Sequence, residues 1–460
     1  MRTIEFIGWT AAITSILGGC SSSGGGATSH TTSSSSSAET GDAATTGSTD
    51  AGSGQSSSGE QSSSSSSSSS GDGATSPPAS PERMLITFGG ATTSETVVLN
   101  VKTKQVEGRI GFDGFGVTDT RNATGPMLLE GAIDVVAALD PTAPWQVGST
   151  WNSALMDGVD GGVFYSQPVA VVEASASNGY ILRYERNDVA VFNPSMTITG
   201  GAPASSVDLS SFVQAGDPDG LVDMMGGAYD ASSSRVYVVL GNINQIAAAS
   251  GSVPCSSEVS TVVAIDTKTN TVASLGGSGP KGSIALKYYN PISVVYDAAG
   301  SRLIVVSGGC NAKGAGDGGV GAPSLRGIEA VNLTTGQSSS LLDLSMVKFP
   351  VGFDDMPTGF AYIDSTHAVI GFDQTGEAVY AWNPTETTIG AVIPNAPDVF
   401  TYDGQGNLLG TRVDTSASGT TSNDVVSVAV SNGASVTLAS NVTSLKGQTY
   451  TAWVDVWPHP

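Results

Sequence analysis

Positive charge is scarce in this sequence, which has 18 Lys and Arg residues against 41 Asp and Glu residues and a formal net charge of −23. Proteins that bind nucleic acid hold the phosphates with clustered Lys and Arg side chains. Adhesion to anionic lipid headgroups has the same requirement. We therefore expect no nucleic-acid partner and no electrostatic attachment to a membrane surface.

Histidine and cysteine are also rare, with three of each among 460 residues. A histidine-based metal centre or a Ser/His/Asp triad would depend on His367 alone, because His30 and His459 lie in a serine-rich segment and at the end of the chain. The sequence has no phosphate loop, dinucleotide fingerprint or zinc-type cysteine spacing. We expect no metal centre of these kinds and predict no catalytic residue.

Large apolar side chains are missing from the stretch between Ser21 and Ser80, which includes nine consecutive serines from Ser62 to Ser70. A segment without such side chains cannot bury enough surface to offset the entropy lost on ordering. The sequence therefore predicts a disordered Ser/Gly-rich tether over 20–82, followed by one folded domain over 83–460.

Residues 1–19 have the composition of a secretory signal, in which Arg2 precedes an apolar run too short to be a mature transmembrane helix. The stretch from Leu17 to Cys20, Leu-Gly-Gly-Cys, resembles the lipobox of bacterial lipoproteins. That resemblance implies lipidation of Cys20, a lipid anchor in the membrane, and a location in the cell envelope, at the outer membrane or cell surface. An ordinary signal peptide is the alternative.

Charged residues make up only 13% of the chain and glycine occurs 59 times, a composition typical of turn-rich β structure. Beyond Arg83, short alternating strands repeatedly end in Asp or Asn followed by a tight turn. The turn positions are Asn100, Asp140, Asn193, Asp266, Asn332, Asn383 and a degenerate copy at Ser431. The Asp or Asn side chain can bond the backbone of its turn, which Gly336 or Asn270 closes with a positive φ.

A second unit precedes the first in the better copies, as in 228–239 and 295–306, and weaker versions occur at 169–184, 360–372 and 400–409. The two units together predict four antiparallel strands, which make one propeller blade. We therefore predict an all-β fold, a single propeller of about seven four-stranded blades, with six or eight as alternatives. The segment from Tyr450 to Trp457 is expected to pair with the strand near Met84 and close the ring.

Two stretches resemble kelch blades: Met84 to Gly90 followed by Thr96 to Asn100, and Leu303 to Gly309 followed by Gly327 to Gly336. The resemblance is a loose pattern over 83–460, and it implies a fold without a particular chemistry.

Cys255 and Cys310 each follow the second strand of a blade, in neighbouring blades. Equivalent loops of adjacent blades lie on one face, so we predict a disulfide between them in an oxidising compartment, with two free thiols as the alternative.

The same face is expected to hold the connections between blades, where propellers commonly bind ligands. The candidate ligand-binding residues there are Asp113, Asp157, Asp160, Asp217, Asp219, Asp223, Asp317, Asp354 and Asp355. Carboxylates with interleaved aromatic residues can hold Ca²⁺, a sugar or a peptide, whereas solvated glycine-aspartate turns are the alternative.

These observations favour a lipid-anchored, non-catalytic envelope protein whose propeller binds a ligand or an unknown partner, which could be an envelope protein, a peptide or a glycan. One alternative is a carbohydrate-active or other hydrolytic propeller that uses Asp or Glu residues. The other is a structural scaffold of the envelope. Whether the protein is an enzyme stays open at this point, and no cofactor other than Ca²⁺ is expected.

Overall fold

The computed structural model describes residues 81–89, 93–114, 116–122, 124–141, 145–158, 165–217, 219–243, 258–313, 320–347, 357–372, 378–415, 421–445 and 450–457. Cys20, the predicted signal peptide and nearly all of the predicted tether therefore lie outside the described residues. No helix in the described segments is both long and apolar enough to cross a membrane.

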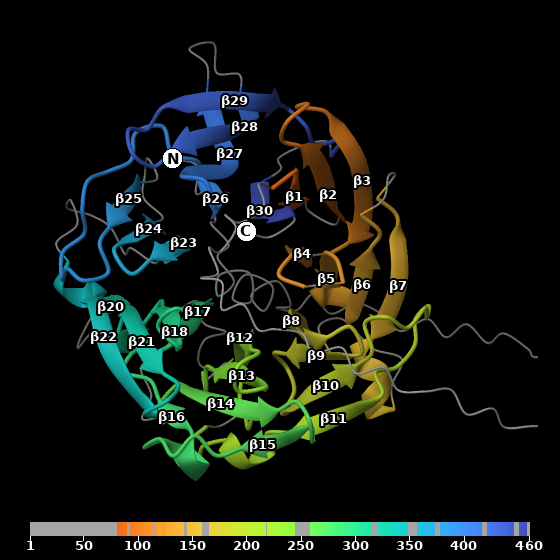
Figure 1. Ribbon diagram of the computed structural model, residues 1–460, viewed down its shortest axis with the longest axis vertical. Helices are drawn as coiled ribbons and strands as arrows, with labels where there is room; N and C mark the ends of the chain where they lie inside the picture. Colours follow the sequence, from red (N-terminus) through yellow and green to blue (C-terminus); the bar gives the residue numbers. More distant parts are fainter. Residues whose placement is uncertain are drawn as a thin grey trace, which may run out of the picture. The chain divides into compact units, whose positions relative to one another are not determined.

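Seven antiparallel sheets stand in a ring around a central axis, and the fold is the predicted β-propeller (Figure 1). From the axis outwards, blade 1 has β30 (Tyr450–Trp457), β1 (Arg83–Gly89), β2 (Thr93–Asn100) and β3 (Val106–Asp113). Blade 2 has β4 (Gly116–Asp119), β5 (Met127–Glu130), β6 (Val135–Leu139) and β7 (Val147–Asn152). Blade 3 has β8 (Pro168–Ser175), β9 (Asn178–Arg183), β10 (Asp188–Phe192) and β11 (Ser205–Asp208).

Blade 4 has β12 (Met224–Asp230), β13 (Arg235–Leu240), β14 (Thr261–Asp266) and β15 (Thr271–Ala273), and β16 (Ile284–Ala285) also pairs with β14. Blade 5 has β17 (Pro291–Asp297), β18 (Arg302–Ser307), β21 (Gly327–Asn332) and β22 (Gln337–Asp343). A separate hairpin of β19 (Cys310–Lys313) and β20 (Val320–Ser324) interrupts it in sequence.

Blade 6 has β23 (Pro357–Asp364), β24 (His367–Phe372) and β25 (Ala378–Trp382), with a single bridge from Tyr380 to Val392 in place of a regular fourth strand. Blade 7 has β26 (Val399–Tyr402), β27 (Asn407–Thr415), β28 (Thr421–Ala429) and β29 (Ser435–Ser440). Five short 3-10 helices lie in the described loops: η2 (Gly131–Ile133), η3 (Ser153–Asp157), η4 (Ser210–Phe212), η5 (Pro280–Gly282) and η6 (Leu344–Met346).

The last strand closes the ring as predicted, because β30 pairs antiparallel with β1 from Arg83 opposite Trp457 to Gly89 opposite Tyr450. Blade 1 thus combines its innermost strand from one end of the chain with three strands from the other. This pairing covers the inner edge of β1, which would otherwise present unpaired backbone groups.

At five of the seven predicted turn positions the side chain bonds the backbone of its own turn. Asn332 Oδ1 accepts hydrogen bonds from the backbone nitrogens of Thr334 and Thr335 at 3.0 and 2.8 Å, and Gly336 closes that turn with a φ of 67°. The same bonding occurs at Asn100, Asn193, Asp266 and Asn383. In blade 7 the bonding residue is Asn432, one position after the predicted Ser431.

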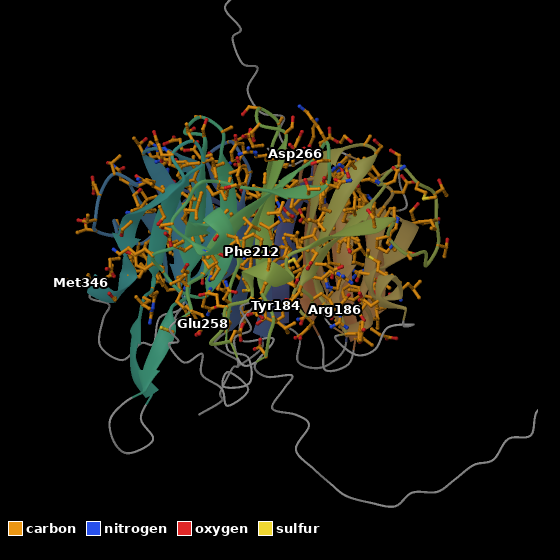
Figure 2. All side chains as sticks on the ribbon, turned by 90° about the horizontal axis from the view of Figure 1, so that it is seen from below. Tyr184, Arg186, Phe212, Glu258, Asp266 and Met346 are labelled. Atoms are coloured by element: carbon orange, nitrogen blue, oxygen red, sulfur yellow. The ribbon has the colours of Figure 1, made fainter. Side chains whose placement is uncertain are left out.

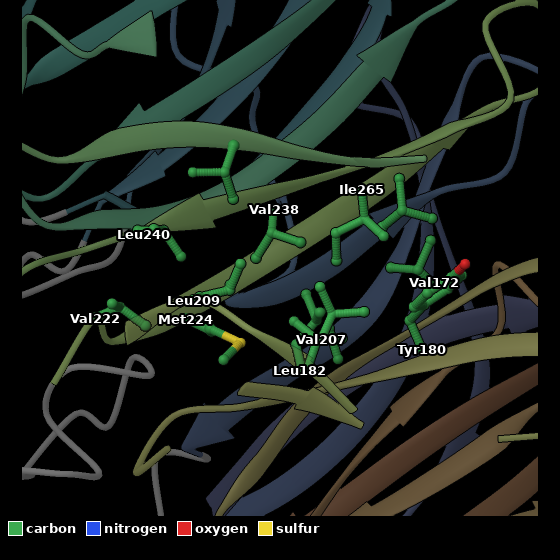
Figure 3. Close-up of a cluster of buried hydrophobic side chains, with 14 of the residues drawn as sticks. Val172, Tyr180, Leu182, Val207, Leu209, Val222, Met224, Val238, Leu240 and Ile265 are labelled. Carbon is green, nitrogen blue, oxygen red and sulfur yellow. The ribbon is translucent and has the colours of Figure 1, made fainter. Parts of the chain in front are cut away.

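Each hydrophobic core lies between two neighbouring blades, and the described residues form seven such clusters. Figure 3 shows the cluster between blades 3 and 4, in which Tyr180 and Leu182 of β9 lie across from Met224 of β12 and Val238 of β13. Because both faces of a blade are covered, its central strands are apolar along their whole length rather than in alternation. In β13, for example, all residues from Val236 to Leu240 are buried.

The ring has two faces with different connections. Turns between the first and second and between the third and fourth strands form one face, here called the turn face. Loops between the second and third strands and the connections between blades form the other, here called the loop face. Figure 2 shows Asp266 of a turn at one face and Tyr184, Arg186 and Glu258 of loops at the other.

Candidate functional site

Three predicted carboxylates meet on the loop face, in the connection that leads from blade 3 to blade 4. Asp217, Asp219 and Asp223 each offer an oxygen, and these oxygens all lie within 4.8 Å of one another. They belong to residues 213–223, which join η4 to β12 and are called the acidic connection below; Pro218 within it lies outside the described residues. The structure therefore brings together three of the nine predicted ligand residues.

Asp223 is fixed at the start of β12. It is fully buried and has a φ of 50°, a left-handed conformation that is uncommon for a residue other than glycine. Its Oδ2 accepts a hydrogen bond of 2.5 Å from the backbone nitrogen of Ile243, and its backbone oxygen accepts one of 2.7 Å from Gly241. These bonds fasten Asp223 to the loop that follows β13.

Asp217 and Asp219 are half-buried. The backbone nitrogen of Leu221 donates to Asp219 Oδ1 at 3.0 Å, which makes a tight local turn. Asp217 Oδ2 is shielded from solvent and accepts no hydrogen bond in the described part of the chain. Burial is the main reason why the pKa of the Asp217 carboxyl is raised to about 7, and the neighbouring Asp219 and Glu258 add to this shift. The acidic connection is thus an electrostatically unfavourable group of like charges.

Further acidic groups surround the connection. Burial and the charge of Asp219 raise the pKa of Glu185 to about 7. Glu258 is buried and contributes to the raised pKa of Asp217. Burial raises the pKa of the Tyr184 hydroxyl well above its ordinary value, and the charge of the nearby Asp223 adds to this shift.

Two asparagines frame the acidic connection. Asn187 donates through Nδ2 to the Gly220 oxygen at 2.7 Å and accepts through Oδ1 from the Val222 nitrogen at 3.0 Å, which holds the loop in shape. Asn242 is fully buried, and its Nδ2 donates to the Val259 oxygen at 3.2 Å. Its Oδ1 is buried and has no hydrogen-bond partner among the described residues.

Other predicted ligand residues lie apart from this group. Asp113 is exposed at the end of β3. Burial of Glu130 raises the pKa of its carboxyl to about 7, and the charge of Asp113 adds to this shift. Asp157 is bound by Arg183 Nη1 at 2.9 Å and by Arg186 Nε at 3.2 Å, so it has a structural ion pair. Four predicted ligand residues lie outside the described residues: Asp160, Asp317, Asp354 and Asp355.

The cysteine predictions are only partly covered. Cys310 begins β19 and is buried, in the loop region that follows the second strand of blade 5. It is the one cysteine within the described segments, because Cys20 and Cys255 both lie outside them. The disulfide between Cys255 and Cys310 therefore stays a prediction.

His367, the histidine predicted to lie within a blade, begins β24 on the turn face. Its side chain is exposed, and Nδ1 lies 3.0 Å from Asp364 Oδ1. The turn beside it is thus built like those of the other blades, with an acidic residue that binds its own loop.

Arg183 forms a buried network between blades 2 and 3. Its guanidinium donates to the Ser153 oxygen and to Asp157, both at 2.9 Å, and it also pairs with Asp188. The side chain is completely buried, whereas the two carboxylates are 23% exposed. Arg186, at 24% exposure, pairs with Asp157 from the solvent side.

A repeated contact joins blades on the turn face. The Tyr362 hydroxyl of blade 6 donates to Asp297 Oδ2 of blade 5 at 3.0 Å, and Arg302 contacts both groups at 2.9 and 2.8 Å. In the preceding pair of blades, Tyr296 bonds Asp230 in the same way, and burial with this bond raises the tyrosine pKa to about 12. The two tyrosines occupy equivalent positions, because each pairs with the second residue of the next strand, Leu303 for Tyr296 and Ala368 for Tyr362.

Comparisons with known proteins assign no activity to this chain. No family model matches the chain, and no curated protein matches it either. Among solved structures it is similar to a protein from Lactobacillus plantarum, at 12% identity over 82% of this chain and 99% of that one, with a TM-score of 0.47. The β-propeller domain of Cps50 (Swd1) from Myceliophteria thermophila matches at 9% identity over 79% and 98%, with a TM-score of 0.42.

Hydrazine synthase from Kuenenia stuttgartiensis is similar over 59% of this chain, at 13% identity and a TM-score of 0.37. The chain spans 65% of the length of that protein, which is less than two thirds. At such identities and TM-scores no activity or ligand is transferred to this chain.

Proposed function

We propose that this protein is a non-catalytic binding module of the bacterial cell envelope, whose propeller holds a positively charged ligand at the acidic connection of the loop face. The observation that carries the proposal is the close grouping of Asp217, Asp219 and Asp223, in which one buried oxygen of Asp217 accepts no hydrogen bond from the described residues. A cationic group would offset the repulsion of these carboxylates.

The direction in which the chain enters the ring supports a role in display. β1 begins at Arg83, directly opposite Asn100 at the turn between β2 and β3, so the chain joins the propeller on the turn face. We propose that Cys20 is lipidated, that residues 20–82 form a flexible tether, and that the protein is anchored at the outer membrane or cell surface. Because the chain joins the ring on the turn face, the entry of the chain does not occupy the loop face that carries the acidic connection.

A kelch-like type of blade remains part of the proposal, on the residues that resemble it. The ligand could belong to an envelope protein, a peptide or a glycan, and positive charge is the property that the acidic connection would recognise.

Binding of a labelled Lys-rich dodecapeptide tests the proposed function. Fluorescence anisotropy at 150 mM NaCl is expected to detect binding to the EDTA-treated full chain, and Asp219→Asn is expected to weaken it at least tenfold. Asp113→Asn, which removes the same charge elsewhere on the loop face, is the matched control and is expected to change affinity less than twofold. Equal losses in both variants would refute a specific site. Turnover of a glycan panel that is lost in Asp217→Asn would instead favour the hydrolytic alternative.

The anchor has its own test. Mass spectrometry of the protein from membranes is expected to show an acylated peptide that begins at Cys20, and Cys20→Ser is expected to release the protein from the membrane fraction. An unmodified peptide across this site would contradict the lipid anchor.

A further inference from the structure

The donor atoms of the acidic connection indicate which kind of positively charged ligand it binds. The described donors are oxygens: the carboxylates of Asp217, Asp219 and Asp223 form the group, and the buried Asn242 Oδ1 is a further oxygen without a partner among the described residues. Hard divalent cations prefer such ligands, whereas Zn²⁺ sites use histidine and cysteine. We propose that the acidic connection binds Ca²⁺; this inference rests on the proposed function and names the ligand class of the same site.

Two buried oxygens without partners among the described residues support a bound ligand. Asp217 is a member of the carboxylate group, and its buried Oδ2 accepts no hydrogen bond from the described residues. Asn242 Oδ1 is the second such atom, on a side chain with no exposed surface. Buried polar atoms are nearly always satisfied in folded proteins, so two orphans around one group of carboxylates call for an explanation.

The hydrogen bonds place Asn242 beside the carboxylates. Its backbone nitrogen donates to the Val222 oxygen at 3.2 Å, and the next residue, Ile243, donates to the Asp223 carboxylate. Its amide nitrogen binds the Val259 oxygen, which also accepts from the Gln214 side chain at 2.7 Å. The Asn242 amide thus lies between the residue before Asp223 and the segment that leads to Asp217.

The spacing of the carboxylate oxygens fits the size of the ion. Ca²⁺ binds oxygen at 2.3–2.6 Å, so two ligands on opposite sides of it are about 4.8 Å apart. The oxygens of Asp217, Asp219 and Asp223 all lie within this separation. Mg²⁺ binds at about 2.0–2.1 Å, requires a stricter octahedron and usually keeps several waters rather than using a set of protein ligands, so Ca²⁺ is the ion proposed here.

The charges of the acidic connection also favour a divalent cation. Asp217, Asp219 and Asp223 repel one another at this separation, because their oxygens all lie within 4.8 Å. A divalent cation bound between the three carboxylates would offset that repulsion.

Isothermal titration of the EDTA-treated full chain with CaCl₂ tests the inference. We expect one ion to bind at pH 8, with MgCl₂ at least tenfold weaker, and the melting temperature to rise by about 3 °C at a hundredfold excess over Kd. Asp217→Asn and Asp219→Asn are each expected to weaken Ca²⁺ binding at least tenfold. Asp113→Asn, on the same face, is expected to leave it unchanged.

Asn242→Gly tests the neutral ligand separately. Asn242 has a φ of 48°, which glycine adopts without strain, so this variant removes the amide oxygen and preserves the backbone conformation. We expect a several-fold loss of Ca²⁺ affinity with an unchanged circular dichroism spectrum. Absence of binding heat in the wild type, or equal Ca²⁺ affinity in the wild type and Asp219→Asn, would overturn the inference. Binding of the Lys-rich peptide to the metal-free protein would then decide the proposed function on its own.

Discussion

Replacement of Arg183 by methionine would test how strongly a single buried cation holds two blades together. Methionine has a similar length and no charge, so the apolar stem remains while four polar contacts are lost. Those contacts are with Asp157, Asp188 and two backbone oxygens, those of Ser153 and Asp188. Asp157 and Asp188 would lose the cation that they share, and Asp157 would keep its contact with Arg186.

The size of the effect follows from burial. Removal of one member of a buried ion pair costs about 3–5 kcal/mol because the remaining charge loses its partner. Asp157 and Asp188 are 23% exposed and regain some hydration, so a cost of about 3 kcal/mol is expected. The unfolding entropy of a propeller of about 380 residues is roughly 0.8 kcal/mol/K, which converts this cost into a melting temperature lower by about 4 °C.

Differential scanning calorimetry of the wild type and Arg183→Met would measure this shift. Arg186→Met is the matched control, because Arg186 binds the same Asp157 from a position that is 24% exposed. An exposed ion pair is worth at most about 1 kcal/mol, so the control should lose about 1 °C. A wild-type melting temperature for Arg183→Met, or equal losses in the two variants, would refute the reasoning from burial.

Two further predictions concern the turn face and pH. Tyr362→Phe removes a hydrogen bond to the charged Asp297 between blades 5 and 6. Differential scanning calorimetry should show a melting temperature lower by roughly 1–3 °C. An unchanged melting temperature would mean that the contact of Arg302 with Asp297 alone is sufficient for stability. The raised pKa of Glu185 means that the folded protein binds the proton of this carboxyl more tightly than the unfolded chain does. The contribution of this proton to stability is therefore full below about pH 4.5 and is lost as the pH rises through about 7. Thermal melts in metal-free buffer should therefore show a falling melting temperature between pH 5 and 8, and a Glu185→Gln variant with the same fall would contradict this assignment.

The repeat in the fold could be predicted because its signal is local. An Asp or Asn side chain binds nitrogens two or three residues ahead, so residues such as Asn332 mark their turns whatever the rest of the chain does. The closing strand could be predicted because an apolar segment at Tyr450 to Trp457 had no blade of its own. The β19–β20 hairpin and the extra strand β16 have no such marker, and they were not predicted.

The candidate site was predictable only as a face. Asp157 and Asp217 have similar sequence surroundings, each near a glycine and a second acidic residue. Asp157 is nevertheless paired with two arginines, whereas Asp217 Oδ2 accepts no hydrogen bond from the residues that the structure describes. The difference arises from which loops the ring brings together, and that is a property of long-range packing. Glu185 and Asn242 were missed for the same reason: each lies a short distance after the second strand of its blade, where no local pattern distinguishes a site residue.

The shared construction of blade 1 also dictates when the molecule can finish folding. Trp457 pairs with Arg83 across about 370 residues, and contacts over such a separation form late because the intervening chain must be closed into a loop first. A chain that emerges from its amino terminus, during synthesis or passage through a membrane, holds β1 with one bare edge until its final strand arrives. Assembly of this ring is therefore completed by the last segment to appear, and protection against aggregation is needed most in the interval before it does.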